Sequence, residues 1–339
     1  VKLDWDISEN HRASYTYNYN DGYNWSQSDS DDNEFEFSDH YYERGAELKS
    51  HTAALFSSWT ERFSTELRVS MLDLDNRQNS RSGVRDQGVF GEVQVETWAD
   101  VDNDGQFSRA IVYLGTDDSR QANDLDYEAL NIKVAANYEL GNHLLTAGFE
   151  QDDLDVYNLF IQHVDTENRF DEECNSSNPN GCIDAFREAR PDDIYYGNAA
   201  PSNDPVNGAA EWSYKINTAY LQDEWITLGG DLTFVFGIRY DWYSSSDKPA
   251  LNQNYLDRAG FANTATVDGL DLIQPRFGFN WTITPDFSVR GGVGLYAGGN
   301  PNVWLSNNFS NDGIRVVQLR ESLIERDPPD GCGEGRDFS

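Results

Sequence analysis

Three segments in the second half of the chain alternate apolar and polar residues, namely 232–242, 274–283 and 287–295. In the first segment one face carries Leu232, Phe234, Phe236, Ile238, Tyr240 and Trp242. Successive residues of a β-strand point to opposite sides, so each segment predicts a strand with one apolar and one polar side. A soluble sandwich turns such apolar sides inward, whereas a membrane barrel turns them outward to lipid.

The same alternation predicts ten strands, arranged as five hairpins. The pairs are 2–7 with 12–20, 46–57 with 62–74, 125–139 with 143–156, 212–226 with 232–243, and 275–283 with 287–297. The turns inside the pairs are short and use Gly, Asn, Asp and Pro where special backbone angles are needed. The connections between the pairs are long and polar: 21–45, 75–124, 157–211 and 244–274. We expect brief helical turns only at 186–190 and 317–325.

This alternation of short and long connections favours a membrane barrel over a sandwich. Outer-membrane barrels have short periplasmic turns and long outside loops. The predicted strands also exceed the roughly 5–6 residues typical of globular proteins. Aromatic residues such as Trp59, Trp225 and Trp242 gather near the strand ends, where interfacial girdles lie. The sequence therefore predicts an all-β fold: an antiparallel up-and-down transmembrane β-barrel segment of about ten strands with long extracellular loops. It would occupy residues 1–326, followed by a polar loop at 327–339.

Composition limits the possible binding partners, and the two ends of the sequence bear on whether it is a whole protein. The 339 residues carry a formal net charge of −34, which argues against nucleic acid or an anionic membrane surface as a partner. No stretch approaches 18 consecutive apolar residues, so we expect no transmembrane helix. Val1 opens directly into a strand pattern without a secretion signal, and 327–339 adds no closing strand. We therefore expect the chain to be a fragment.

Several segments resemble the barrel of TonB-dependent outer-membrane receptors. Two of them are Tyr-Leu-Gln-Asp-Glu-Trp at 220–225, followed by Gly-Ile-Arg-Tyr-Asp at 237–241. Gln-Pro-Arg-Phe-Gly at 274–278, followed by Ser-Val-Arg-Gly-Gly at 288–292, is similar to a further hairpin of these barrels. The segments 55–60, 63–66 and 298–304 are similar to the Oar-like subgroup. The resemblance covers essentially the whole chain and is densest from 212 to 304.

The resemblance implies a 22-stranded barrel closed by a plug domain, of which this chain would form slightly under half of the wall. Such receptors lie in the outer membrane of Gram-negative bacteria and take up a scarce ligand with energy passed through TonB. The implied partners are outer-membrane lipid, the receptor's own plug, TonB and a small ligand. The plug and the TonB-contacting segment would precede Val1. Siderophore, cobalamin, saccharide and peptide all stay open as ligands.

The polar strand faces supply candidate contacts to a plug. An Arg facing lipid near the middle of the bilayer would cost about 2–4 kcal/mol, so the charged residues of the strands should face the lumen. We single out Arg239, Asp241, Arg276 and Arg290 because they lie on adjoining hairpins. The alternative is that they only hydrate the lumen wall.

Asp100, Asp102 and Asp104, followed by Gly105, match the first half of a calcium-binding loop. Alternate carboxylates converge on a hard cation there, and Gly allows a sharp turn. The Glu expected at the twelfth position is missing, because Ile111 stands there. The segment reads equally well as a hairpin turn between two strand-like runs, 89–98 and 110–114. Calcium in the outer loops is the one metal we consider, and we expect no other cofactor.

Cys174 and Cys182 enclose a tight polar loop, Asn-Ser-Ser-Asn-Pro-Asn-Gly. A local disulfide would imply an oxidising compartment, and two free thiols are the alternative. Cys332 has no visible partner.

Enzymatic motifs are missing, so we expect no catalytic activity. The five histidines show no metal-ligand spacing, and neither a Gly-x-Ser-x-Gly sequence nor a phosphate loop is present. The alternative to a receptor wall is a surface adhesin or another acidic β-rich binding or structural protein, built as a small barrel or a soluble domain without transport.

Overall fold

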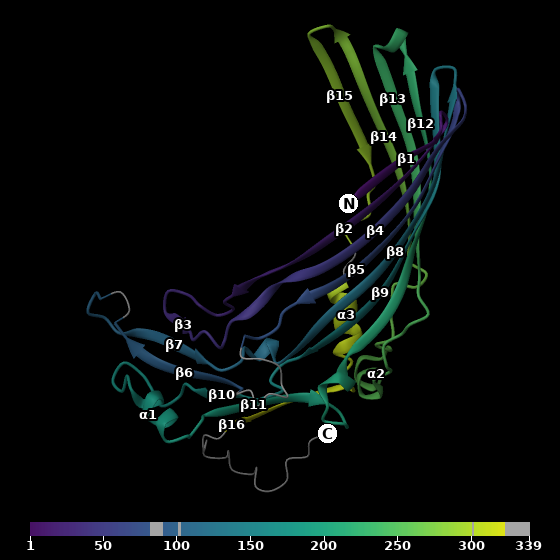
Figure 1. Ribbon diagram of the computed structural model, residues 1–339. Coiled ribbons are helices and arrows are strands. Elements are labelled where there is room, and N and C mark those ends of the chain that lie inside the picture. The colour runs from purple at the N-terminus through teal and green to yellow at the C-terminus, as the bar shows by residue number, and fades with distance from the viewer. Residues whose placement is uncertain (82–90, 101–102, 300–301, 323–339) are drawn as a thin grey trace.

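The computed structural model describes residues 1–81, 91–100, 103–299 and 302–322, and its strands form two sheets (Figure 1). The larger sheet has ten strands, all paired antiparallel and ordered as they occur in the chain. They are β1 (Lys2–Ser8), β2 (His11–Ser26), β4 (Tyr42–Thr60), β5 (Phe63–Arg77), β8 (Ala122–Leu140), β9 (His143–Ile161), β12 (Ala210–Thr227), β13 (Leu232–Ser244), β14 (Asp271–Thr284) and β15 (Phe287–Gly294).

The ten predicted strands are confirmed, and so are the five short turns. Most strands extend further toward the long connections than predicted; β2, for example, continues from residue 20 to Ser26. The turn between β8 and β9 is Gly141-Asn142, and Gly141 has a φ of 61°, a conformation that favours glycine. The alternation of apolar and polar residues thus located the strands. It also fixes how they pair, because a slip by one residue would move every apolar side chain to the other face.

The large sheet is strongly curved (Figure 1). Its five short turns lie at one end and the long connections at the other. Each strand is paired with its chain neighbours, so β1 and β15 form the two edges of the described sheet. The fold is therefore an antiparallel up-and-down wall, as predicted, and the described strands form an open segment.

The long connections are not merely polar loops, which corrects our expectation. They contribute a second, six-stranded sheet, which lies beside the ends of β2, β4 and β5 (Figure 1). Its strands in spatial order are β16 (Val316–Ser322), β11 (Asp193–Ala199), β10 (Glu167–Phe170), β6 (Glu92–Ala99), β7 (Ser108–Leu114) and β3 (Glu34–Glu36). We call it the loop sheet. Two of its pairings, β10 with β6 and β3 with β7, are parallel and join different connections.

The helical turn expected at 317–325 was wrong over the described residues. Residues 316–322 form β16, which pairs antiparallel with all of β11 from Asp193↔Ser322 to Ala199↔Val316. A seven-residue apolar and polar pattern is short enough for a distant partner strand to decide its conformation. The polar end loop at 327–339 lies outside the described residues.

Short helices decorate the loop end of the molecule. They are α1 (Gly181–Arg187), α2 (Gln253–Ala259) and α3 (Asn302–Ser310), with 3-10 turns at Asp118–Arg120 and Pro205–Gly208. A further 3-10 turn, Leu228–Gly230, lies at the other end of the sheet, in the short turn between β12 and β13. Helix α1 packs on the loop sheet in a small core with β6 and β10. That core contains Val93, Val95, Phe170, Cys174, Cys182 and Ala185. Among the residues described, none of the helices has the length and apolar character needed to cross a membrane.

Candidate functional site

One face of the large sheet exposes large apolar side chains across many strands. Leu67, Val134 and Phe149 are direct neighbours on β5, β8 and β9, and they are 43%, 47% and 38% exposed. Trp225, Ile238 and Trp281 continue this face toward β14. A contiguous exposed apolar surface of this extent marks a contact with lipid or protein rather than with water. On a curved antiparallel sheet with aromatic ends, it fits the lipid side of a barrel.

The apolar band ends at the same level on adjacent strands. Met71 on β5 is paired with Leu130 on β8, and the next pairs toward the long connections are Asp73 with Glu128 and Asp75 with Asp126. Strand β8 has 19 residues, which is about 60 Å of chain and about twice what a barrel strand needs to cross a bilayer. The acidic ends of the strands, and the loop sheet beyond them, therefore project past the apolar band.

The opposite face carries a row of charged groups at one level, which we call the ion-pair ladder. It contains Glu66 and Arg68 on β5, Lys133 on β8, Glu150 on β9, and Arg239 and Asp241 on β13. Glu66 bridges Arg68 at 2.7 Å and Lys133 at 3.2 Å. Arg239 lies 3.3 Å from Glu150 and 2.8 Å from Asp241. Paired charges of both signs on one face indicate a polar lumen wall.

Three of the four predicted plug contacts belong to one hydrogen-bond network. The buried Asp241 carboxylate accepts hydrogen bonds from Arg239, from the Thr218 hydroxyl at 2.7 Å and from the Gln274 side chain. Arg276 donates to Gln274 Oε1 at 3.2 Å, and its guanidinium lies 4.6 Å from the Tyr296 ring centroid. Arg290 lies apart on β15, opposite Asn280. The structure thus groups these residues on the polar face, and their contact with a plug stays a prediction.

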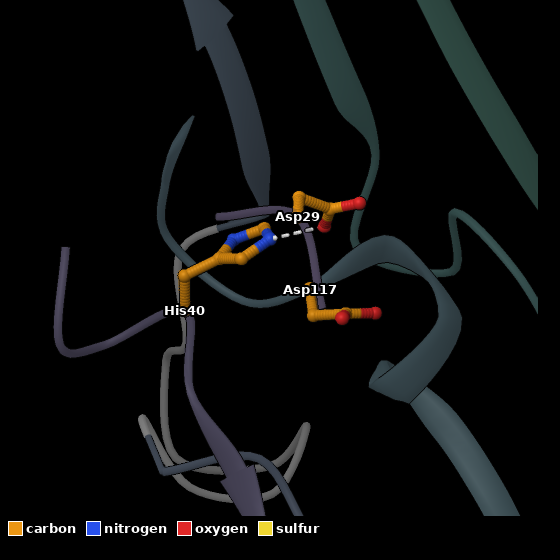
Figure 2. A group of neighbouring side chains, drawn as sticks. All are labelled: Asp29, His40 and Asp117. Carbon is orange, nitrogen blue, oxygen red and sulfur yellow. Dashed lines mark hydrogen bonds and ion pairs between the residues drawn. The ribbon is translucent and has the colours of Figure 1, made fainter. Parts of the chain in front are cut away.

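A second polar site lies in the connections that carry the loop sheet. Its centre is His40, which is fully buried just after β3 (Figure 2). The His40 ring nitrogens face two acceptors: Nδ1 lies 3.1 Å from the Gly115 carbonyl oxygen, and Nε2 lies 3.1 Å from Asp29 Oδ2. One potential metal-ligand atom from each of Asp29, His40 and Asp117 lies within 4.8 Å of the other two. We call these three residues the His40 triad.

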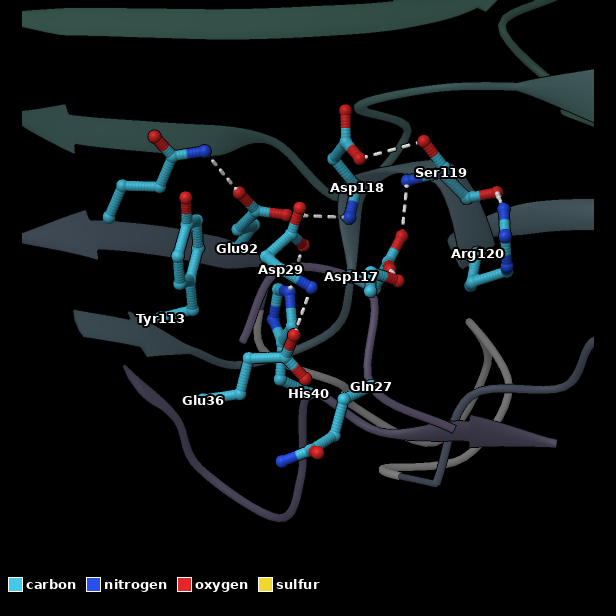
Figure 3. A network of polar contacts seen from close by, with 12 residues as sticks. Gln27, Asp29, Glu36, His40, Glu92, Tyr113, Asp117, Asp118, Ser119 and Arg120 are labelled. Atoms are coloured by element: carbon cyan, nitrogen blue, oxygen red, sulfur yellow. Dashed lines mark hydrogen bonds and ion pairs between the residues drawn. The ribbon is translucent and has the colours of Figure 1, made fainter. Parts of the chain in front are cut away.

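Further carboxylates surround the triad (Figure 3). Glu36 is 2% exposed and accepts the Asp29 amide N–H through Oε1. Glu92, at the start of β6, is also buried and accepts the Asp118 N–H at 2.7 Å. Asp117 accepts the Ser119 N–H at 2.8 Å and the Ser28 hydroxyl. Backbone and hydroxyl donors therefore hold each carboxylate in a fixed orientation.

This crowding of charge shifts the pKa values of the site. Burial alone would lower the pKa of His40, but the hydrogen bond to Asp29 and the negative charges of Glu92, Asp117 and Glu36 raise it to about 9. Burial, reinforced by the charge of Asp118, raises the pKa of Glu92 to about 8. Burial also raises the pKa of Glu36. The site thus favours a positive charge at its centre.

A second triad, formed by Asp118, His163 and Glu167, adjoins the first. His163 Nδ1 lies 2.9 Å from Glu167 Oε2 and 3.6 Å from Asp118 Oδ2. Glu167 is fully buried and also pairs with Arg169, and these contacts lower its pKa although burial alone would raise it. The adjacent residues Asp117 and Asp118 thus link the two triads. In the second triad an arginine already supplies the compensating charge.

The profile of the outer membrane beta barrel domain family matches residues 1–322. The chain belongs to the outer membrane beta barrel domain family. Its apolar sheet face therefore meets lipid, and the protein is located in the outer membrane. Membership of this family rules out the soluble domain that we gave as an alternative.

The solved structure of the outer membrane transporter YddB from Escherichia coli is similar to this outer membrane beta barrel domain in fold. The TM-score is 0.54 and the sequence identity is 14%, over 95% of this chain and 33% of that chain. The domain described here thus spans about a third of the length of that structure. No curated protein matches the chain significantly in sequence.

The predicted calcium loop of this barrel domain lies between β6 and β7, which form the hairpin that we gave as the other interpretation. Asp100 accepts the N–H groups of Asp104 and Gly105, at 3.0 and 3.1 Å, and Asp104 accepts that of Gln106. Both carboxylates thus stabilise the turn itself. Asp102 lies outside the described residues, and calcium stays a prediction.

The two cysteines predicted to pair, Cys174 and Cys182, form a disulfide bond in the structure. It joins the segment after β10 to the first turn of α1, inside the core of the loop sheet. Cys332 lies outside the described residues.

The His40 triad was missed by sequence reasoning. Its residues lie in two connections and are 11 and 77 positions apart in sequence, so they follow no local spacing. The one available signal was that His40 follows the acidic run at 29–36, and acidic runs usually form solvated loops. Only the pairing of β3 with β7 brings Asp117 next to His40.

Proposed function

We propose that this chain is part of the wall of a TonB-dependent outer-membrane receptor of the Oar-like subgroup, which takes up a scarce ligand across the outer membrane. The resemblance of segments 220–241 and 274–292 to such receptors supports TonB dependence. The likeness to YddB, an outer membrane transporter, supports transport. In this proposal the wall itself catalyses no reaction and carries no resident cofactor.

The ion-pair ladder is the observation that carries the proposal. A lumen wall that is only hydrated does not need paired charges at the same height on β5, β8, β9 and β13. Arg239 can exchange its partly exposed partner Glu150, and Arg276 its neutral partner Gln274, for carboxylates of a plug at little net cost. Such contacts hold a plug in place and still let it move when it is pulled.

The loop sheet would then form the outer mouth of the receptor. Ligand-binding residues are commonly placed on loops that a rigid scaffold positions. Here the connections themselves are ordered by strand pairing, by helix α1 and by the disulfide bond of Cys174 and Cys182. Ligand capture would use this surface together with the plug.

Competitive growth of the native host tests the proposal. A strain that lacks the gene is compared with wild type under limitation of iron, cobalamin, saccharides or peptides, in backgrounds with and without TonB. We expect a growth deficit on one nutrient that disappears in the TonB-deficient background, because the receptor is already inactive there. A deficit of equal size in both backgrounds would contradict TonB dependence, and loss of surface attachment without any growth deficit would establish an adhesin.

Complementation with two charge reversals refines the test. Arg276→Glu reverses a charge on the lumen face, whereas Arg258→Glu reverses one on the exposed helix α2. We expect Arg276→Glu to restore less uptake than Arg258→Glu at equal amounts of protein in the outer membrane. Equal restoration would show that the positive charge of Arg276 on the lumen face is not needed for transport.

A further inference from the structure

We propose that Asp29, His40 and Asp117 form a binding site for a divalent transition-metal ion of the Zn²⁺ class, which joins the first two outer connections. Asp29 and His40 flank β3 in the connection between β2 and β4, and Asp117 precedes β8 in the connection after β5. A metal ion held by all three would fix the loop sheet to the barrel wall. This site is separate from the lumen face on which the proposed transport rests.

The orientation of His40 is the first argument. A carbonyl oxygen can only accept a hydrogen bond, so Nδ1 carries the proton in its contact with Gly115. This leaves Nε2 to face Asp29 and Asp117 (Figure 2). A metal-binding histidine is usually held in this way, with its second nitrogen donating to a backbone carbonyl or a carboxylate.

The spacing of the donor atoms is the second argument. Zn²⁺ binds nitrogen and oxygen ligands at about 2.0–2.2 Å, so ligand atoms around it lie about 3–4 Å apart. The three ligand atoms already lie within 4.8 Å of one another, and His40 Nε2 lies 3.1 Å from Asp29 Oδ2. An imidazole among carboxylates suits Zn²⁺ and its neighbours better than Ca²⁺ or Mg²⁺, which prefer oxygen alone.

An unpartnered carboxylate oxygen beside the triad is the third, independent argument. Glu36 is 2% exposed, and its Oε2 has no hydrogen-bond partner in the described part of the chain. Figure 3 shows the Glu36 carboxylate next to the His40 ring, with Asp29 above it. A buried carboxylate oxygen without a partner is costly, and a cation bound at His40 would compensate it.

The charge balance points the same way. Among the described residues in direct contact with Asp29, Glu36 and Asp117, His40 is the one basic side chain for three carboxylates. In the second triad, by contrast, Arg169 pairs with Glu167. An ion could enter the site along Asp29, whose side chain is 38% exposed.

Metal binding by the full-length protein in detergent tests the site. The protein is stripped with a chelator and titrated with ZnCl₂ by calorimetry, and with Co²⁺ by visible absorption, which reports nitrogen and oxygen coordination. We expect one equivalent to bind, and Asp29→Asn to weaken the affinity at least about 10-fold. Asp29→Asn keeps the shape of a partly exposed side chain, so the barrel should still fold; heat-modifiable migration on gels checks this.

Two matched controls separate this site from other acidic groups. Asp75→Asn alters an acidic cluster on the wall, and His51→Gln alters a histidine on β4. Both variants should bind Zn²⁺ as the wild-type protein does. If the wild-type protein binds no equivalent of metal, or if Asp29→Asn binds it with unchanged affinity, the proposal is wrong. Loss of binding in Asp75→Asn but not in Asp29→Asn would move the site to the wall and would equally refute it.

Discussion

Replacing Leu221 with Arg should destabilise the protein far more than the same change at its neighbour Gln222. Both side chains are exposed in the described structure, and Leu221 is 54% exposed. They lie on opposite faces of β12: Leu221 is paired with Ala147 and Ile238 on the apolar face, and Gln222 with Thr146 and Gly237 on the polar face. The two variants therefore differ in the face of the sheet that receives the Arg, while the strand and the introduced side chain are the same.

The depth of Leu221 in the bilayer determines how much free energy the Arg substitution costs. Trp225 belongs to the aromatic girdle near the short turns, and Leu221 lies four residues further along the strand. At about 3.3 Å per residue and a tilt of about 40°, this places Leu221 about 10 Å into an apolar band about 25 Å tall. An Arg near the middle of the bilayer costs about 2–4 kcal/mol, which corresponds to a change of about 30- to 900-fold in the unfolding equilibrium. Gln222→Arg should cost less than about 1 kcal/mol.

Equilibrium unfolding of the full-length protein in lipid vesicles, followed by tryptophan fluorescence in guanidinium chloride, measures both values. The difference between the two variants is the informative quantity, since the reference state cancels. Equal costs at the two positions, or a larger cost at Gln222, would refute the assignment of the apolar face to lipid.

Three further predictions concern the Asp241 network, the protons on His40 and Glu92, and the disulfide bond. Asp241→Ala leaves Arg239 and Gln274 without their shared acceptor and should lower the free energy of unfolding by about 3 kcal/mol, whereas Asp231→Ala in a turn should change it little; chemical denaturation compares them. In metal-free protein the loop sheet should loosen as pH rises, because the folded state holds protons on His40 up to about pH 9 against 6.5 when unfolded, and on Glu92 up to about 8 against 4.5. The stabilisation by His40 is complete below about pH 6.5, and the protection of residues 27–42 from amide exchange should fall above that. It should fall less in His40→Gln, where only the contribution of Glu92 remains. Replacing Cys174 and Cys182 with Ser should weaken the segment around α1 by about 2–3 kcal/mol, and unchanged proteolysis of 171–190 would contradict this.

The wall of the barrel could be predicted because its signal is local. Each strand has to present an apolar side to lipid over about ten residues, so residues such as Phe234, Phe236 and Ile238 recur at every second position. The turns contain Gly141 or Gly229-Gly230 for equally local reasons of backbone geometry. The predicted strand starts and ends were less accurate toward the long connections, where the lipid no longer imposes alternation. There β9 continues as Tyr-Asn-Leu-Phe-Ile, with Leu159 and Phe160 placing apolar side chains on opposite faces.

The loop sheet and the His40 triad could not be predicted, because non-local contacts determine both. Strand β3 has three residues and exists because it pairs with β7, more than 70 positions later. The pattern of residues 317–325 suited a helix as well as a strand, and over the described residues 317–322 the pairing with β11 determines a strand. His40 follows a turn in an acidic segment that is ordinary in sequence, and its role depends on a fold that places Asp117 and Gly115 around it.

A structure of the full-length protein in lipid, determined by electron cryomicroscopy, would test the central claim most directly. The account predicts a closed barrel that contains the strands β1 to β15, with lipid against Leu221 and Ile238 and a plug domain in contact with Arg239, Asp241 and Arg276. A barrel whose lumen holds no plug, or in which β1 and β15 pair with each other to close these ten strands alone, would contradict it.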